Sequence, residues 1–132
     1  MEEEIHLENR EDLNVLLKQT PYNYILLKFT ADWCKPCKVI QPFLSDCVNE
    51  KIKDLDQLNK KNIFLYIEVD VDVCFDLYAF LKKKKAINGI PALFLYKTDI
   101  SRTQEESHMY LPHAFVSGTN ESEIKKVFEL IQ

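Results

Sequence analysis

The chain has 132 residues, which is enough for one domain with a hydrophobic core, so we expect residues 1–132 to form a single domain. Hydrophobic residues make up 46% of the chain and charged residues 29%, as in an ordinary soluble globular protein. The formal net charge of -4, without a basic stripe, argues against nucleic-acid binding, because contacts with phosphates need clustered lysine and arginine side chains.

The N-terminal residues and the cysteine pattern predict a protein of a reducing compartment. Met1–Glu4 is acidic, whereas a secretory signal begins with basic residues, and no apolar run approaches the roughly 20 residues that cross a bilayer. We therefore expect no membrane association and a cytoplasmic location. Four cysteines are too few for a disulfide scaffold, and Cys34 and Cys37 are spaced as a C-x-x-C pair whereas Cys47 and Cys74 stand alone.

The first part of the chain is predicted to alternate between strands and helices. Ile5–Leu7 predicts a short strand, and Asn9 can cap a helix whose apolar residues share one face. The run Tyr24–Thr30 is apolar on both alternating faces, which is typical of a central strand in a parallel sheet. An amphipathic helix then begins at Cys34, and Pro42 inside it predicts a kink.

The second part continues this alternation. The polar stretch Lys51–Asn62 predicts the end of the long helix and a loop, after which Ile63–Val69 predicts a second buried strand. Asp72 can cap a third helix, which ends at Lys82–Lys85, where the helix dipole favours positive charge. The remaining predicted elements are strand Ala92–Tyr96, polar connection Lys97–His113, strand Ala114–Val116 and a final helix capped by Asn120.

This order of elements predicts an α/β fold with a central mixed sheet of about five strands, flanked by about four helices and joined by right-handed crossovers. The C-x-x-C motif follows the carboxyl end of the predicted strand Tyr24–Thr30. Open α/β sheets place their functional sites at that edge, so we expect the site there.

The two cysteines of the motif are expected to have different roles. Cys34 lies in the first turn of its helix, where free backbone N–H groups and the positive end of the helix dipole stabilise a thiolate. We therefore expect the pKa of Cys34 to fall below that of free cysteine. Cys37 follows one turn later and is more enclosed, which suits it to resolve a mixed disulfide between Cys34 and a substrate. The other cysteines and histidines lack the paired spacing of a structural zinc site.

The segment Phe29–Lys38, which reads FTADWCKPCK, resembles the active site of the thioredoxin family. The resemblance covers nearly the whole chain, since Pro42 matches the family's helix-kinking proline and Glu68–Asp72 the end of its third strand. Gly89–Pro91 matches its cis-proline loop, and Gly118 matches the glycine of its substrate groove. The resemblance implies a thioredoxin fold and a monomeric thiol–disulfide oxidoreductase that reduces disulfide-containing protein substrates. It also implies no bound cofactor and recharging by a thioredoxin-reductase-type flavoenzyme.

The resemblance further implies how a substrate would bind. A cis peptide bond between Ile90 and Pro91 would place a bare backbone edge opposite Cys34, able to pair with an extended segment of substrate. The implied substrate-binding residues around this edge are Trp33, Pro36, Ile90, Pro91 and Gly118.

Two charged residues depart from the family pattern. Lys35 stands where thioredoxins usually carry glycine, and its ammonium should favour the Cys34 thiolate and make the disulfide somewhat more oxidising. Lys28 replaces the family's buried acid, and we hypothesise that it pairs with Glu68 on the neighbouring strand, since an unpaired buried charge is costly. Proton transfer to and from Cys37 would then run through Glu68, a partly neutral Lys28, or water.

Other interpretations remain open at this point. The connection Lys97–His113 is longer than the family's hairpin, and either shapes partner choice or is a tolerated insertion, with its histidines at the surface. Lys35 and the missing acid also suit a more oxidising disulfide oxidase or isomerase, and a binding subunit with incidental cysteines is a third possibility. Cys47 is expected to be buried on an apolar helix face, and Cys74 to be an exposed thiol with regulatory potential.

Overall fold

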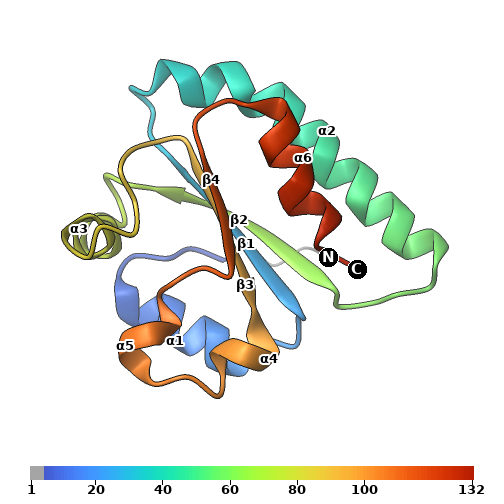
Figure 1. Cartoon of the computed structure of the whole chain (residues 1–132), viewed down its shortest axis with the longest axis horizontal. Coiled ribbons are helices and arrows are strands. Elements are labelled where there is room, and N and C mark those ends of the chain that lie inside the picture. The colour runs from blue at the N-terminus through green and yellow to red at the C-terminus, as the bar shows by residue number, and fades with distance from the viewer. Residues whose placement is uncertain (1–4) are drawn as a thin grey trace.

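The computed structural model describes residues 5–132. A central sheet carries helices on both faces (Figure 1). Within residues 5–132, no helix is both long enough and apolar enough to pass through a bilayer. The elements in chain order are α1 (Arg10–Gln19), β1 (Tyr24–Thr30), α2 (Lys35–Gln57), β2 (Phe64–Asp70), α3 (Phe75–Lys83), β3 (Ala92–Lys97), α4 (Thr98–Ser101), α5 (Glu106–Met109), β4 (Ala114–Ser117) and α6 (Glu121–Glu129).

In the described part of the chain, the sheet has four strands in the order β2-β1-β3-β4. β1 runs parallel to β2 and antiparallel to β3, and β3 runs antiparallel to β4, so the predicted mixed sheet is confirmed. The predicted strand Ile5–Leu7 is wrong, because these residues lie in no strand of the described sheet. Leu7 is nevertheless buried in the core, which explains why its apolar character suggested a strand.

β1 is the central strand that its sequence predicts, since every side chain from Ile25 to Phe29 is buried. Ile25, Leu27 and Phe29 pack in the core cluster that includes α1 and α3 residues. Leu26 lies in the second cluster, with α2 and α6 residues. Because side chains alternate along a strand, Lys28 lies on the same face of the sheet as Leu26 and is directed towards α2.

α2 ends at Gln57, within the polar stretch Lys51–Asn62, which confirms the predicted helix end and loop. Leu55 is buried on the inner face of α2 and extends the apolar stripe by two turns beyond Val48. Burial of this stripe against the sheet therefore outweighs the local polarity of the sequence. Pro42 lies inside the helix, as the sequence requires.

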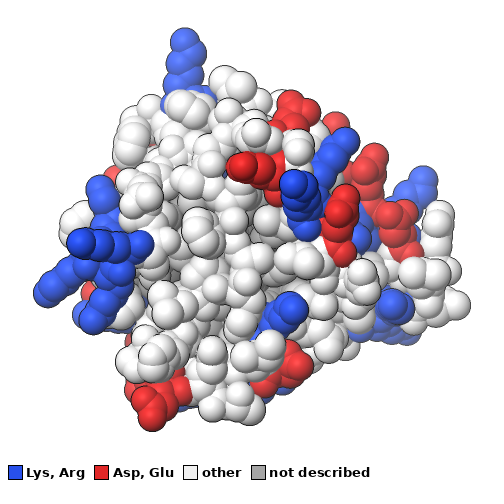
Figure 2. All heavy atoms as spheres, in the orientation of Figure 1, with Lys and Arg blue, Asp and Glu red and all other residues white. Residues whose placement is uncertain are grey.

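Two predicted helix caps have different outcomes. The Asn120 side chain accepts a hydrogen bond from the Glu123 N–H at 3.1 Å, which confirms it as the cap of α6. Asp72 does not cap α3, because that helix begins only at Phe75, after Cys74, and has no side-chain cap. The cationic end of α3 is as predicted, and the exposed run Lys82–Lys85 contributes to the positive cluster beside α3 in Figure 2.

The connection Lys97–His113 contains the two short helices α4 and α5, so residues 5–132 contain six helices where four were expected. It packs beside α1, at the opposite end of the sheet from the start of α2 (Figure 1). The Thr98 hydroxyl donates to the Tyr22 carbonyl at 2.7 Å, and Met109 is fully buried. The connection is thus an integral part of the core at the end of the sheet remote from the C-x-x-C motif.

His113 is half-buried, so the prediction that it lies at the surface is wrong. Its Nδ1 accepts a hydrogen bond from the Lys97 backbone N–H at 2.8 Å. Burial, and secondarily the Lys97 charge, lowers the pKa of His113. The folded protein therefore binds this proton less readily than the unfolded chain does.

This shift predicts a pH-dependent stability. His113 should contribute fully to the free energy of unfolding above the unfolded pKa near 6.5, and its contribution should be lost as the pH falls below about 6.5. Denaturant unfolding of the wild type and of His113→Phe at several pH values measures the difference. Parallel pH profiles for the two proteins would contradict the prediction.

Candidate functional site

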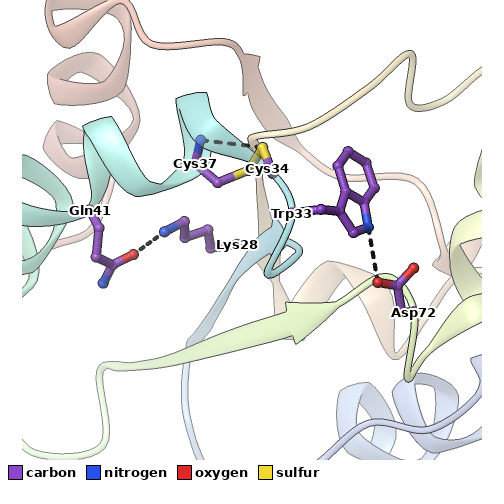
Figure 3. Close-up of a disulfide and its surroundings, with 6 residues drawn as sticks. All are labelled: Lys28, Trp33, Cys34, Cys37, Gln41 and Asp72. Atoms are coloured by element: carbon purple, nitrogen blue, oxygen red, sulfur yellow. Dashed lines mark hydrogen bonds between the residues drawn. A yellow bond between two sulfur atoms is a disulfide. The ribbon is translucent and has the colours of Figure 1, made fainter.

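Cys34 and Cys37 form a disulfide at the start of α2, with their Cα atoms 5.3 Å apart. Cys34 occupies the N-cap position, and the Cys37 backbone N–H donates to Cys34 Sγ at 3.3 Å (Figure 3). Both side chains are almost completely buried in the oxidised protein. The same N–H would stabilise a thiolate on Cys34 after reduction, because helix N-termini favour negative charge.

A tight turn between β1 and α2 positions the dithiol. The Cys34 N–H donates to the Ala31 carbonyl at 3.1 Å, and the Cys34 carbonyl accepts from the Lys38 N–H at 3.3 Å. Pro36 fits the first turn of α2 because a first-turn residue needs no backbone N–H for the helix. Lys35 is exposed, so water and salt screen its charge from the sulfurs.

Trp33 is 67% exposed beside the disulfide. Its indole N–H donates to the Asp72 carboxylate at 3.0 Å (Figure 3). Asp72 is in turn held by its backbone N–H, which donates to the Asp70 side chain at 2.8 Å. Asp72 is therefore a positioning residue for Trp33. Its signal in the sequence is weak, namely an aspartate just after a buried strand.

The expected proline loop is present, and the Ile90–Pro91 peptide bond is cis. Ile90 packs against the buried cluster that contains Cys34 and Cys37. The Gly118 N–H donates to the Pro91 carbonyl at 2.9 Å, which joins the two predicted parts of the substrate groove. Gly118 has a φ of +93°, a conformation that residues with a side chain rarely adopt.

Lys28 and Glu68 are opposite each other on β1 and β2, but they do not form the direct ion pair that we hypothesised. Gln41 lies between them. The buried Lys28 Nζ donates to Gln41 Oε1, and Gln41 Nε2 donates to Glu68 Oε1 at 2.9 Å and to Ser45 Oγ at 3.2 Å. Burial lowers the pKa of Lys28, and the Glu68 carboxylate partly offsets this effect.

The sequence interpretation missed Gln41. Its spacing from Cys37 contained a signal, because residues four positions apart on a helix lie on the same side. The spacing does not predict that the Lys28 side chain extends from β1 to this amide (Figure 3).

The prediction that Cys74 is exposed is wrong, because its side chain is fully buried in the core between β2 and α3. Burial raises the pKa of Cys74 to about 11. Cys47 is half-buried on α2, and burial raises the pKa of its thiol too. Neither thiol has the electropositive surroundings of a reactive cysteine.

These environments predict slow thiol labelling. In the folded, oxidised protein, Cys74 should stay unmodified by an alkylating reagent at neutral pH, and Cys47 should react slowly. Both should react fully in denaturant. Mass spectrometry of the wild type and of Cys47→Ser assigns the label, and rapid modification of Cys74 in the folded protein would contradict its burial.

Among residues 5–132, no group of three or more histidine, cysteine, aspartate or glutamate side chains is placed to hold a metal ion. The arrangement at the start of α2 instead offers two sulfurs that can exchange between a disulfide and a dithiol. An exposed indole and a cis-proline loop accompany the sulfurs.

Comparisons with known proteins agree with this geometry. The thioredoxin family model matches residues 4–111. Thioredoxin 3 of Plasmodium falciparum is 28% identical over 125 residues, which are 95% of this chain and 57% of that protein. The thioredoxin of Oryctolagus cuniculus is 32% identical over 73 residues, which are 55% of this chain and 60% of that protein. The chain thus spans less than two thirds of the length of these two curated relatives.

A solved structure of Plasmodium falciparum thioredoxin superimposes with a TM-score of 0.63 and 22% identity, covering 97% of this chain and 100% of that one. This likeness establishes the fold. It agrees with the mixed sheet and the helices on its two faces, although the sheet has four strands within residues 5–132. Since the family model matches most of the sequence, the chain belongs to the thioredoxin family.

Proposed function

We propose that this chain is a thiol–disulfide oxidoreductase that reduces protein disulfides with Cys34 and Cys37. The observation that carries the proposal is the disulfide itself, formed at the N-terminus of α2 with a backbone N–H directed at Cys34 Sγ. Membership of the thioredoxin family supports the same class of chemistry. The partners would be disulfide-containing proteins, with a thioredoxin-reductase-type flavoenzyme restoring the dithiol.

The reaction begins from the reduced protein. The Cys34 thiolate attacks one sulfur of the substrate disulfide, and the other substrate sulfur leaves as a thiolate and takes up a proton. Cys37 then gives up its proton and attacks Cys34 Sγ, which releases the second substrate sulfur, again to be protonated. The substrate gains two electrons and two protons, and the Cys34–Cys37 dithiol loses them as its disulfide forms.

The substrate would dock around Trp33, Pro36, Ile90, Pro91 and Gly118. An extended segment can pair with the backbone beside Pro91, where the cis bond and the Gly118 contact fix the loop. The exposed face of Trp33 offers apolar contact area beside the sulfurs. The protein would act as a monomer in the cytoplasm, where thiols are kept reduced.

Charged groups near the dithiol would tune the reaction. Lys35 would favour the Cys34 thiolate by a modest, salt-screened interaction. Lys28 and Glu68 would influence the proton of Cys37 through the chain of polar contacts on the α2 face of the sheet. The two lysines also support a second candidate function, a more oxidising oxidase or isomerase, because cations stabilise the reduced thiolate form.

The direct test is reduction of a protein with interchain disulfides in the presence of excess small dithiol. The wild type should accelerate the reduction, and Cys34→Ser should not. Equal activity of the two proteins would refute the proposed function. Equilibration of the dithiol with a glutathione couple then separates the candidates, since a potential near the glutathione poise would favour the oxidase or isomerase.

A further inference from the structure

A polar chain runs from the buried face of β1 to the surface of β2, one helical turn from the dithiol. Its members are Lys28, Gln41 and Glu68, and the Tyr66 hydroxyl donates to the same Glu68 oxygen at 3.4 Å. Lys28 is 2% exposed, whereas Glu68 is exposed to solvent. The chain therefore joins a buried ammonium to a solvated carboxylate through one neutral amide.

The orientation of the Gln41 amide follows from its neighbours. Its oxygen must face the Lys28 ammonium, which can only donate, and its nitrogen must face the Glu68 carboxylate, which can only accept. The reversed amide would set donor against donor and acceptor against acceptor. The Ser45 hydroxyl accepts a further hydrogen bond from the same nitrogen at 3.2 Å.

We propose that Gln41 is a positioning residue for the dithiol reaction, which holds the Lys28 ammonium charged and in place at the Gln41 amide, one helical turn from Cys37. The inference rests on the proposed function and adds to it a residue that controls the sulfur chemistry. Gln41 lies one turn after Cys37 on α2, so the ammonium that it holds is on the helix side that carries this sulfur.

The groups around Lys28 explain why its buried ammonium needs Gln41 as a hydrogen-bond acceptor. From β3 the register partner of Lys28 is Leu93, which is apolar, and from β2 the charged group is Glu68. From α2 the ammonium meets the Gln41 side-chain oxygen. Because Glu68 is reached only through the amide, Gln41 supplies the hydrogen-bond acceptor that a buried ammonium requires.

Loss of the amide should therefore weaken the positive charge that Gln41 holds one helical turn from Cys37. A buried lysine without an acceptor favours the neutral amine, and a neutral amine no longer stabilises a nearby thiolate. The thiolate form of the reduced dithiol would become less stable, so the reduction potential of the Cys34–Cys37 pair would become more negative. This effect is electrostatic and does not require any change of the fold.

The experiment compares Gln41→Met with Asn49→Met, which alters an exposed amide on the same helix. In the reduced proteins, the pH at which Cys34 reaches half of its maximal alkylation rate should rise by roughly half a unit in Gln41→Met. Its reduction potential should also become more negative. Asn49→Met should match the wild type in both measurements.

A double-mutant cycle with Lys28→Met tests whether the effect of Gln41→Met depends on the Lys28 ammonium. In a Lys28→Met background, Gln41→Met should shift neither the alkylation profile nor the potential any further. An undiminished effect in that background would overturn the assignment, as would wild-type values for Gln41→Met itself.

The failure of this inference can be distinguished from failure of the proposed function. If Cys34→Ser stops disulfide reduction but Gln41→Met titrates like the wild type, the function stands and the role of Gln41 is wrong. If Cys34→Ser reduces disulfides as fast as the wild type, the proposed function fails first. Thermal unfolding of each variant identifies any protein that is not folded, and Gln41→Glu, which keeps an acceptor for Lys28, then provides the folded comparison.

Discussion

Replacing Cys37 by serine should stop turnover and leave the protein covalently bound to its substrate. Cys34 can still attack a substrate disulfide, because it keeps its place at the N-terminus of α2. The mixed disulfide then has no neighbouring thiol to resolve it, since serine oxygen does not attack a disulfide at a useful rate. Catalytic reduction should fall by at least about a thousandfold, as expected when a group that acts in the bond-breaking step is removed.

The trapped complex provides the measurement. Electrophoresis without reductant, followed by mass spectrometry, should reveal a mixed disulfide through Cys34 in Cys37→Ser and no such species in Cys34→Ser. Cys47→Ser is the matched control, because it changes a half-buried thiol on the same helix outside the disulfide. A mixed disulfide that forms through Cys37 instead of Cys34 would reverse the two roles.

The second large effect is expected in the core. Phe94 on β3 is completely buried, and its ring contacts those of Phe29, Tyr96 and Phe115 at centroid distances of 5.0, 6.4 and 6.3 Å. Phe94→Ala should remove these contacts and leave a cavity, which lowers the free energy of unfolding by about 3 to 5 kcal/mol. Denaturant unfolding followed by circular dichroism measures this loss.

Phe115 supplies the control for that measurement. It lies on β4 directly opposite Phe94, but its side chain is 63% exposed. Phe115→Ala should therefore lower the free energy of unfolding by only about 1 kcal/mol or less, since little of its surface is removed from water in the folded state. Equal losses for the two variants would mean that Phe94 is not the centre of this aromatic cluster.

Local patterns were sufficient for most of the fold. The continuous apolar run of β1 predicted a central strand, and Asn120 followed by Glu123 predicted the start of α6. These predictions succeed because a strand's burial and a helix cap depend on residues that are neighbours in sequence. The strand Ile5–Leu7 was predicted wrongly, because tertiary packing decides whether a weak local signal forms an element.

The sequence by itself determined the dithiol, because a C-x-x-C pair at the start of a helix brings two sulfurs together through local geometry alone. Only the tertiary structure decided that Asp72 binds Trp33, that Cys74 is buried and that Gln41 separates Lys28 from Glu68. The physical reason is that each of these outcomes depends on side chains that meet across different strands and helices. The periodicity and spacing of residues in the sequence do not predict which of these side chains come into contact.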